Sequence, residues 1–425
     1  MPSSRAAADC GQHSELRSNW RLLLAATIGT GVGFPSVAYY TIGIFAPELA
    51  KTFGWSFASI FGGLTVIAGT LLIGSPIAGL LVDRYGGRGV ATASLIGLGI
   101  SYISLAASTG SLVQYYITWL FIGVSGVGAT FVPFTKAVNL AFRKQRGLAL
   151  GVTLAGTGLF ILICKPWANW LLMRFGWRSA VVGIGLLPAV IGASAVWWGL
   201  PGKRVGLPPS HSSTHPTLEA PGLTLKDAAR MRAFWLMIAI LILISFASAA
   251  PFPNMENILH SVHVGTQAVI ELTAWVGAMM IFGRLLGGWI MDRFRAPLVG
   301  AVFLLGAGGG SWLMARPAVT DAEAYAAISL LGMAAGLEGG LISFLSARYF
   351  GVRHYGAIYG LMLGIFAVGA AAGPGVFGYA YDRLGSYMLI LKICAYLFGL
   401  AATLLLLMGP YPAYPVSING PQRMQ

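Results

Sequence analysis

The chain has 425 residues, of which 56% are hydrophobic and only 9% are charged, with a net charge of +14. Soluble domains carry about 25% charged residues, so this chain cannot cover a water-exposed surface and is predicted to be a polytopic helical membrane protein. The positive charge does not indicate nucleic-acid binding, because the basic residues are spread over short loops between apolar runs rather than over one soluble face.

Twelve apolar runs are long enough to cross a bilayer as helices. They cover residues 20–46, 56–82, 88–108, 111–140, 147–172 and 178–200, and then 233–258, 266–291, 297–315, 322–348, 355–381 and 386–408. The predicted fold is an all-α membrane protein with two six-helix bundles, 20–200 and 233–408. Residues 201–232, rich in Pro, Ser and His, are predicted to link them, and residues 1–19 and 409–425 to form tails.

The basic residues fix an expected orientation. Eighteen of the 27 lysines and arginines fall on the side of the amino terminus, five on the opposite side and four inside the runs. Since cytoplasmic loops carry the excess of positive charge, both termini and the linker are expected in the cytoplasm. The protein is expected in the plasma membrane, which would be the inner membrane in a bacterium, and as a monomer.

The two halves share a motif at the end of their second helix. The first half has GLLVDRYGGR at 79–88, and the second has GWIMDRFR at 288–295. Parallel six-span repeats around a central loop resemble major facilitator transporters, and the first motif resembles their signature between helices two and three. The aspartate could accept from a helix amino terminus or pair with a loop arginine across the halves. The alternative is a polar turn that only anchors the loop.

The resemblance implies a cytoplasmic gate that breaks when the protein opens inward. In this chain the matching positions are Gly79, Asp83, Arg84, Arg88, Gly288, Asp292 and Arg293, together with Arg146.

A narrower resemblance lies in residues 141–157, AFRKQRGLALGVTLAGT, which are similar to the signature of the monocarboxylate transporter family. The run GRLLGG at 283–288 also aligns with an arginine-containing run of that family. Oxalate–formate exchangers belong to the same broad group. The resemblance implies secondary transport of organic monocarboxylates by alternating access, with proton symport as the favoured coupling and anion exchange as the alternative.

Arg284 is the candidate substrate clamp. It lies inside an apolar helix, where an arginine costs at least ~2.5–3.5 kcal/mol and persists mainly when it faces a cavity or a partner. Its planar guanidinium matches a carboxylate with two hydrogen bonds and keeps its charge. By resemblance, the arginine at this position binds the substrate carboxylate. The alternative is a structural ion pair with Glu338.

Several positions depart from the family pattern. The proton-carrying aspartate of monocarboxylate transporters is matched by Met280, and their first-helix lysine by Tyr40, give or take one residue. The helix-eleven lysine of oxalate–formate exchangers is matched by Met362. With Arg284 as the one certain cation, the substrate is expected to carry a single carboxylate.

Glu338, in the middle of the tenth span, is the proton-carrier candidate. A carboxyl there could bind and release a proton during the cycle, or remain a neutral hydrogen-bonded acid or a static counter-ion. Lys136 and Lys165 are candidate cavity cations, but a lysine near a span end can also extend its ammonium group to the interface.

Aromatic residues lie on helices that, by resemblance, line the cavity. They are Tyr39, Tyr40, Trp275, Tyr359 and Phe366. Their hydroxyls could donate to a carboxylate and their rings could contact the substrate body, although packing is the commoner role of any one aromatic.

No pattern for bond chemistry is present, so we expect neither an enzyme nor a cofactor. A phosphate-binding loop for nucleotides is missing from the sequence. His260 and His263 have a metal-like spacing but fit a solvated loop better, and no metal is expected. The expected partners are a small organic anion, a proton and the lipid bilayer, without nucleic acid or nucleotide. Efflux of other small molecules and ligand sensing without transport are rival functions.

Overall fold

The computed structural model describes residues 15–202 and 222–412, and this part of the chain is almost entirely helical. Within it, eleven helical segments are long and apolar enough to cross a membrane. The longest, Arg146–Gly199, turns at Gly176, whose φ of 78° marks the junction of two helices, so it contains two of the twelve expected spans. The predicted all-α membrane class is confirmed. Most of the predicted linker and tails lies outside the described residues.

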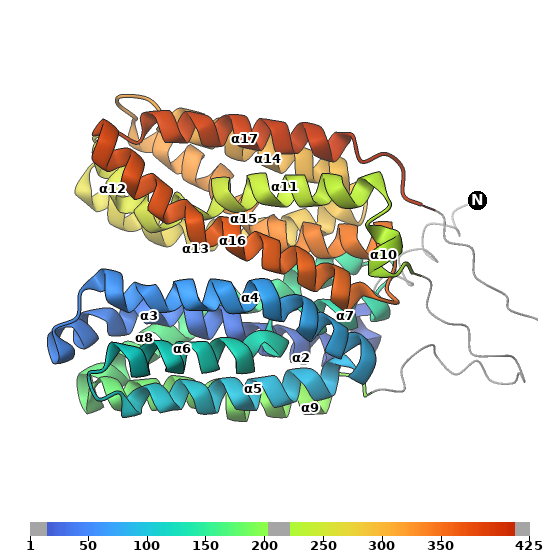
Figure 1. The fold of residues 1–425 in the computed structure, drawn as a ribbon. Helices are drawn as coiled ribbons and strands as arrows, with labels where there is room; N and C mark the ends of the chain where they lie inside the picture. The colour runs from blue at the N-terminus through green and yellow to red at the C-terminus, as the bar shows by residue number, and fades with distance from the viewer. Residues whose placement is uncertain (1–14, 203–221, 413–425) are drawn as a thin grey trace, which may run out of the picture.

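The amino-terminal half holds helices α2 to α9 (Figure 1). They are α2 (Trp20–Gly31), α3 (Phe34–Phe53), α4 (Phe57–Tyr85), α5 (Gly87–Ser104), α6 (Leu112–Gly126), α7 (Phe131–Ala141), α8 (Arg146–Leu186) and α9 (Ala193–Gly199). Short 3₁₀ turns, η1 (Leu105–Ala107) and η2 (Val127–Ala129), extend α5 and α6, and a π-helical turn, η3 (Leu187–Gly192), joins α8 to α9.

The carboxy-terminal half repeats the pattern. It contains α10 (Leu225–Ala228), α11 (Arg232–Ala249), η4 (Phe252–Asn254), α12 (Met255–Ser261), α13 (Thr266–Met291), α14 (Ala296–Met314), α15 (Asp321–Phe350), α16 (Tyr355–Leu384) and α17 (Met388–Leu406). The short helix α10 lies near the end of the predicted linker. Leu223 donates its backbone N–H to the carbonyl of Phe350 at 2.8 Å, which attaches this end of the linker to the second half.

The first predicted span is broken into two helices. α2 ends at Gly31, Gly33 is extended with ψ of −179°, and α3 begins at Phe34. A similar break separates α6 from α7 at Thr130. The two breaks pack together, because a Cβ on Gly33 would come within 2.7 Å of the carbonyl oxygen of Ala129. Irregular backbone at membrane depth is tolerated where protein covers it, as happens here.

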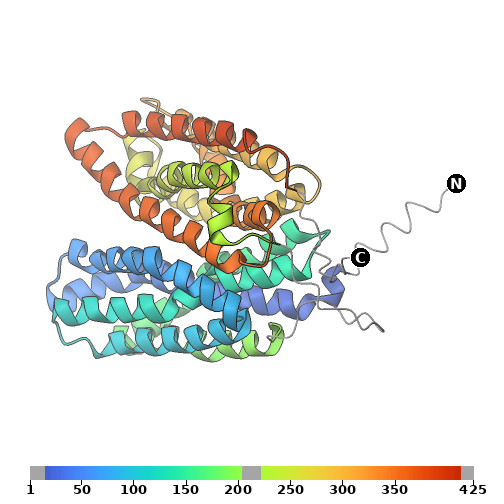
Figure 2. The ribbon, with the colours of Figure 1, turned by 45° about the vertical axis from the view of Figure 1, so that its right-hand side comes forward.

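The two halves lie one against the other and touch most closely at one end (Figures 1 and 2). α4 and α16 run side by side near α10 and diverge toward α12, and α8 and α13 form the second contact. Glycines allow the backbones to meet. A Cβ on Gly79 would overlap the carbonyl of Gly356, and one on Gly288 would overlap the carbonyl of Gly147. We call the end that holds these four glycines the closed end.

Candidate transport site and gate

Arg284 lies on α13 where that helix contacts α8 of the other half, and its side chain is half-buried. Its Nη1 donates to the carbonyl oxygen of Leu154 at 3.0 Å and to the hydroxyl of Thr157 at 2.5 Å. Tyr40 on α3 lies within side-chain hydrogen-bonding range of the guanidinium. The arginine therefore joins both halves through neutral oxygen atoms.

Among the described residues, no carboxylate forms an ion pair with Arg284. A guanidinium held only by neutral acceptors keeps its full charge, and a carboxylate makes a stronger, charge-assisted hydrogen bond than a carbonyl or a hydroxyl. The site is thus able to take an anion in place of one of its present partners.

Glu338 is not the counter-ion of Arg284 in this structure. Its side chain is buried on α15, and its Oε1 accepts a short hydrogen bond from the hydroxyl of Ser248 on α11. Both residues belong to the second half. The carboxyl thus has a polar partner inside its own bundle.

Four of the five candidate aromatic residues differ in how far their side chains are exposed. Tyr40 is exposed and lies next to Arg284, whereas Tyr39 and Phe366 are half-buried. Tyr359 is fully buried and stacks on Tyr355 with their ring centroids 5.2 Å apart, which leaves it as a packing residue in this conformation.

The remaining aromatic residue, Trp275, and the positions that match the family aspartate and the exchanger lysine lie in the second half. Trp275 donates from Nε1 to the hydroxyl of Ser329 on α15 at 2.8 Å. Met362 is fully buried, with its sulfur 3.2 Å from the hydroxyl oxygen of Ser346, and Met280 is half-buried.

Leu154 and Thr157 were not predicted as site residues. Both lie in the 141–157 stretch of α8 that carries the family resemblance. Their contact with Arg284 could not be predicted from that stretch, because residues 154 and 157 are far from residue 284 in sequence. A Cβ on Gly151 would overlap the backbone carbonyl of Arg284, which shows how closely α8 and α13 approach here.

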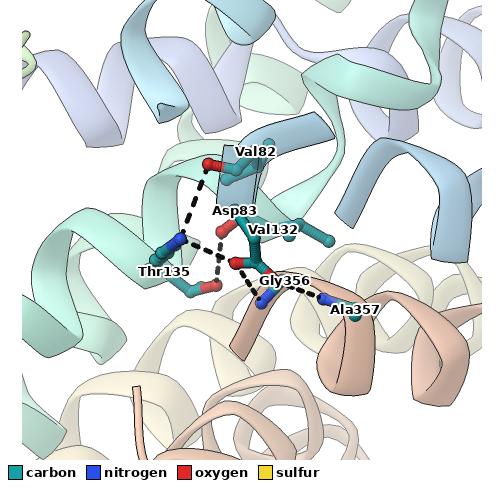
Figure 3. Close-up of polar contacts among 7 residues, drawn as sticks. Val82, Asp83, Val132, Thr135, Gly356 and Ala357 are labelled. Atoms are coloured by element: carbon teal, nitrogen blue, oxygen red, sulfur yellow. Dashed lines mark hydrogen bonds and ion pairs between the residues drawn. The ribbon is translucent and has the colours of Figure 1, made fainter. Parts of the chain in front are cut away.

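At the closed end, Asp83 of α4 caps the amino terminus of α16 (Figure 3). Its carboxylate accepts from the backbone N–H groups of Gly356 and Ala357, each at 2.9 Å. Lys136 of α7 donates to the same carboxylate at 2.6 Å, and both side chains are largely shielded from solvent. An anion at a helix amino terminus is stabilised by the unpaired N–H groups and the helix dipole. Lys136 is thus paired with Asp83 here, while the side chain of Lys165 lies outside the described part of the structure.

Asp292 makes the equivalent contact in the second half. It follows α13 and accepts from the backbone N–H groups of Gly147 at 2.6 Å and Leu148 at 2.9 Å, at the start of α8. Burial raises the pKa of the Asp292 carboxyl, and the two N–H donors oppose that rise. Each half therefore caps a helix of the other, which is the first of the two geometries expected for these aspartates.

Within the described residues, the arginines that were predicted to belong to the gate do not pair with these aspartates and instead contact aromatic rings and carbonyl oxygens. Arg88 lies over the ring of Trp197 at 4.1 Å, Arg84 over Tyr85 at 5.3 Å, and Arg293 over Trp289 at 3.7 Å, all within their own halves. Arg146 donates to the carbonyl oxygens of Asn139 and Phe142. These arginine contacts, cation–π and hydrogen-bonded, lie within one half each and do not join the two halves.

A buried polar chain also crosses the closed end. Tyr355 of α16 donates its hydroxyl to Thr135 of α7 at 3.0 Å and lies 2.8 Å from the hydroxyl of Ser343 on α15. Asn139 of α7 donates to the same Ser343 at 3.0 Å. The hydrogen bonds from Tyr355 to Thr135 and from Asn139 to Ser343 join the two halves, so they require the halves to be together.

Replacing Asp83 by asparagine is expected to open the closed end. The change removes charge-assisted hydrogen bonds worth about 1.5–3 kcal/mol each and leaves Lys136 without its partner, so we expect the closed state to lose population at least about tenfold. The measure is the rate at which a thiol reagent labels Ser343→Cys in a background without native cysteines. Asp382→Asn, an exposed aspartate at the other end of α16, is the control. Equal labelling rates in both variants would contradict the gate.

Two repeated helical halves, capped onto each other at one end and carrying a charged arginine between them, define a membrane transport protein rather than an enzyme. The chain belongs to the Major Facilitator Superfamily, whose family model matches residues 23–374. It is thus a multi-pass membrane protein, and the predicted family is confirmed.

Relatives and solved structures agree with this assignment. The chain is 26% identical over 388 residues to Monocarboxylate transporter 3 of Rattus norvegicus, covering 87% of this chain and 76% of the relative. It is 24% identical over 398 residues to Monocarboxylate transporter 11 of Mus musculus, covering 88% and 84%. Its fold is similar to that of the fucose:proton symporter of E. coli, with a TM-score of 0.68, 15% identity and coverage of 93% and 100%.

Proposed function

We propose that the protein is a secondary transporter of small organic anions that carry one carboxylate, working by alternating access around Arg284. The observation that carries the proposal is the set of neutral acceptors around this guanidinium at the contact between the halves. The similarity to monocarboxylate transporters points to the same substrate class.

The clamp couples binding to the movement of the halves. Arg284 belongs to α13, and its partners Leu154 and Thr157 belong to α8. A carboxylate that binds the guanidinium competes with these contacts between the halves. Substrate binding therefore weakens hydrogen bonds that hold the halves together. Such differential contacts are what allow a ligand to shift a conformational equilibrium.

A single carboxylate suits the cations available. Lys136 is held by Asp83, and the position of the exchanger lysine is occupied by Met362, which is buried. Neither supplies a second positive charge beside Arg284. A dicarboxylate would leave one of its charges without a partner, which is costly away from water.

The test is uptake of labelled lactate, pyruvate and oxalate into liposomes that contain the purified protein. We expect saturable uptake of a monocarboxylate that exceeds oxalate uptake. Faster transport of oxalate than of any monocarboxylate would overturn the substrate class, and export of cationic drugs without carboxylate transport would favour an efflux pump.

The closed end is proposed to face the cytoplasm, because the loops there belong to the side that carries eighteen of the lysines and arginines. The conformation described is then the one closed to the inside. We further propose a location in the plasma membrane and a monomeric state, with both termini in the cytoplasm.

Proton symport is the proposed coupling, with Glu338 as the carrier. The carboxyl is buried, and the Ser248 hydroxyl can stabilise it in either protonation state by donating or accepting a hydrogen bond. Moving a carboxylate together with a proton is electroneutral, so a pH gradient suffices to drive accumulation.

Replacing Glu338 by glutamine is expected to uncouple transport from the pH gradient. The amide keeps the hydrogen bond to Ser248 but cannot carry a proton, so accumulation driven by an imposed pH gradient is lost while exchange of labelled for unlabelled substrate continues. Uptake and exchange in the same liposomes are the measurements. Asp321→Asn, at the exposed start of α15, is the matched control. Undiminished accumulation in the Glu338 variant would remove this residue as the carrier and favour anion exchange as the mechanism.

A further inference from the structure

A pocket of about 260 Å³ opens at the closed end beside the contact between α8 and α13. Six basic residues line it, three from each half. Arg143, Lys144 and Arg146 come from the start of α8 and the loop before it, and Arg293, Arg295 and Arg348 come from the ends of α13 and α15. The pocket is distinct from the Arg284 site, whose contacts lie deeper along α8.

The basic residues of this pocket outnumber the acids near them. Asp292 is its one lining acid, and Glu15 accepts from the backbone N–H groups of Arg143, Lys144 and Gln145 beside it. None of the six basic side chains forms an ion pair with a carboxylate of the described residues. Arg146 lies near Arg143 and Arg348, which repel it, and near Asp292, which attracts it. A cluster of like charges at close range is unfavourable until an anion joins it.

The contacts that these cations do make are neutral. Arg295 donates to the carbonyl oxygen of Gly409 at 2.9 Å, Arg348 lies over the ring of Tyr411 at 4.8 Å, and Arg293 lies over Trp289. Such contacts hold the guanidinium groups in place and leave their charge available. The pocket is therefore organised before a ligand arrives.

We propose that this pocket binds a compact polyanion that carries two or more phosphate charges. Guanidinium forks match phosphate oxygens with paired hydrogen bonds, and six cations suit several negative charges better than one carboxylate. The volume corresponds to the liquid volume of about nine water molecules, at ~30 Å³ each. That space fits a diphosphate group, whether it comes from a soluble molecule or from the headgroup of an anionic lipid.

The ligand is a regulator that holds the closed end shut. Because its cations come from both halves, opening at this end separates Arg143 and Arg146 from Arg293 and Arg348, and the bound anion loses half of its partners. A ligand that binds one conformation more tightly shifts the equilibrium toward that conformation. This regulatory role rests on the proposed alternating access, whereas the binding itself does not.

The binding experiment uses the purified full-length chain in uncharged detergent, with inorganic pyrophosphate as the probe and chloride at equal ionic strength as the reference. The wild-type protein is expected to show a saturable rise in melting temperature. Arg143→Gln/Arg348→Gln, which removes one cation from each half, is expected to weaken binding about tenfold or more. Lys226→Gln/Arg230→Gln, two exposed cations outside the pocket, is the matched control and should bind as the wild type does.

A second arm distinguishes the source of the phosphate. The same three proteins are placed in nanodiscs of phosphatidylcholine with or without cardiolipin, an anionic lipid whose headgroup carries two phosphates. Stabilisation by pyrophosphate that depends on Arg143 and Arg348 indicates a soluble ligand, and stabilisation by the anionic lipid alone with the same dependence indicates a headgroup. If neither stabilises the wild type more than the Arg143/Arg348 variant, the site does not exist and the proposal is wrong.

Uptake assays distinguish binding of pyrophosphate in this pocket from binding at the substrate site. With pyrophosphate on both sides of the liposomes, we expect slower carboxylate uptake by the wild type and unchanged uptake by Arg143→Gln/Arg348→Gln. Equal slowing in both would show competition at Arg284 and would overturn the regulatory role. A protein that binds pyrophosphate through the pocket but moves no carboxylate would refute the proposed function and leave the binding site intact.

Discussion

Replacing Arg284 by glutamine is expected to abolish saturable carboxylate uptake. The guanidinium is the cation of the proposed substrate site, and its loss would leave a substrate carboxylate with only neutral donors there. Truncating one member of a buried hydrogen-bonded charge pair costs about 2–5 kcal/mol, so transport efficiency should fall at least about 30-fold. Initial uptake of labelled lactate over a concentration series gives the measurement.

Lysine at this position is expected to be a poor substitute. It keeps the charge but presents one point of contact instead of a planar fork, so Arg284→Lys should retain only a fraction of the uptake. Arg383→Gln, an exposed arginine at the end of α16, controls for the loss of a positive charge. All variants must elute as the wild type does from a sizing column. A folded Arg284→Gln protein with normal uptake would refute the carboxylate clamp.

The sequence alone was enough to predict the features that follow from composition and local pattern. The apolar runs located the spans, because lipid requires long apolar helices. The charge of Arg284 inside such a run made it the candidate clamp, and the repeated Asp83 and Asp292 made that end of the chain the candidate gate. In each case the signal lay in a short local stretch of sequence.

Contacts across the halves could not be predicted in the same way. Thr157 reaches Arg284, and Lys136 reaches Asp83, only because distant helices pack side by side. The sequence left Glu338 open as a counter-ion, and the structure instead places it against Ser248. The break at Gly33 was also missed, although Gly31, Gly33 and Pro35 stand at it. Pro35 lies at the start of α3, where its missing N–H is tolerated, and could have indicated a new helix start.

Replacing Gly79 by alanine is expected to prevent the halves from closing. A Cβ at this position would overlap the backbone carbonyl of Gly356, and a backbone atom cannot move aside as a flexible side chain can. Overpacking of this kind costs about 1–3 kcal/mol, which corresponds to a roughly 5- to 150-fold shift in population away from the closed state. Gly288→Ala should act in the same way, because its Cβ would overlap the carbonyl of Gly147.

The chain offers matched controls on the same two helices. A Cβ on Gly69 of α4 or on Gly277 of α13 would meet no atom within 4 Å, so alanine at these positions tests helix propensity and membrane insertion without altering the contact between the halves. Distances between spin labels on α4 and α16 at the closed end should increase in Gly79→Ala and remain unchanged in Gly69→Ala, and uptake should follow the same order. If both variants gave the same distances, close backbone contact would not be what holds the halves together, and the gate would depend on Asp83 and Asp292 alone.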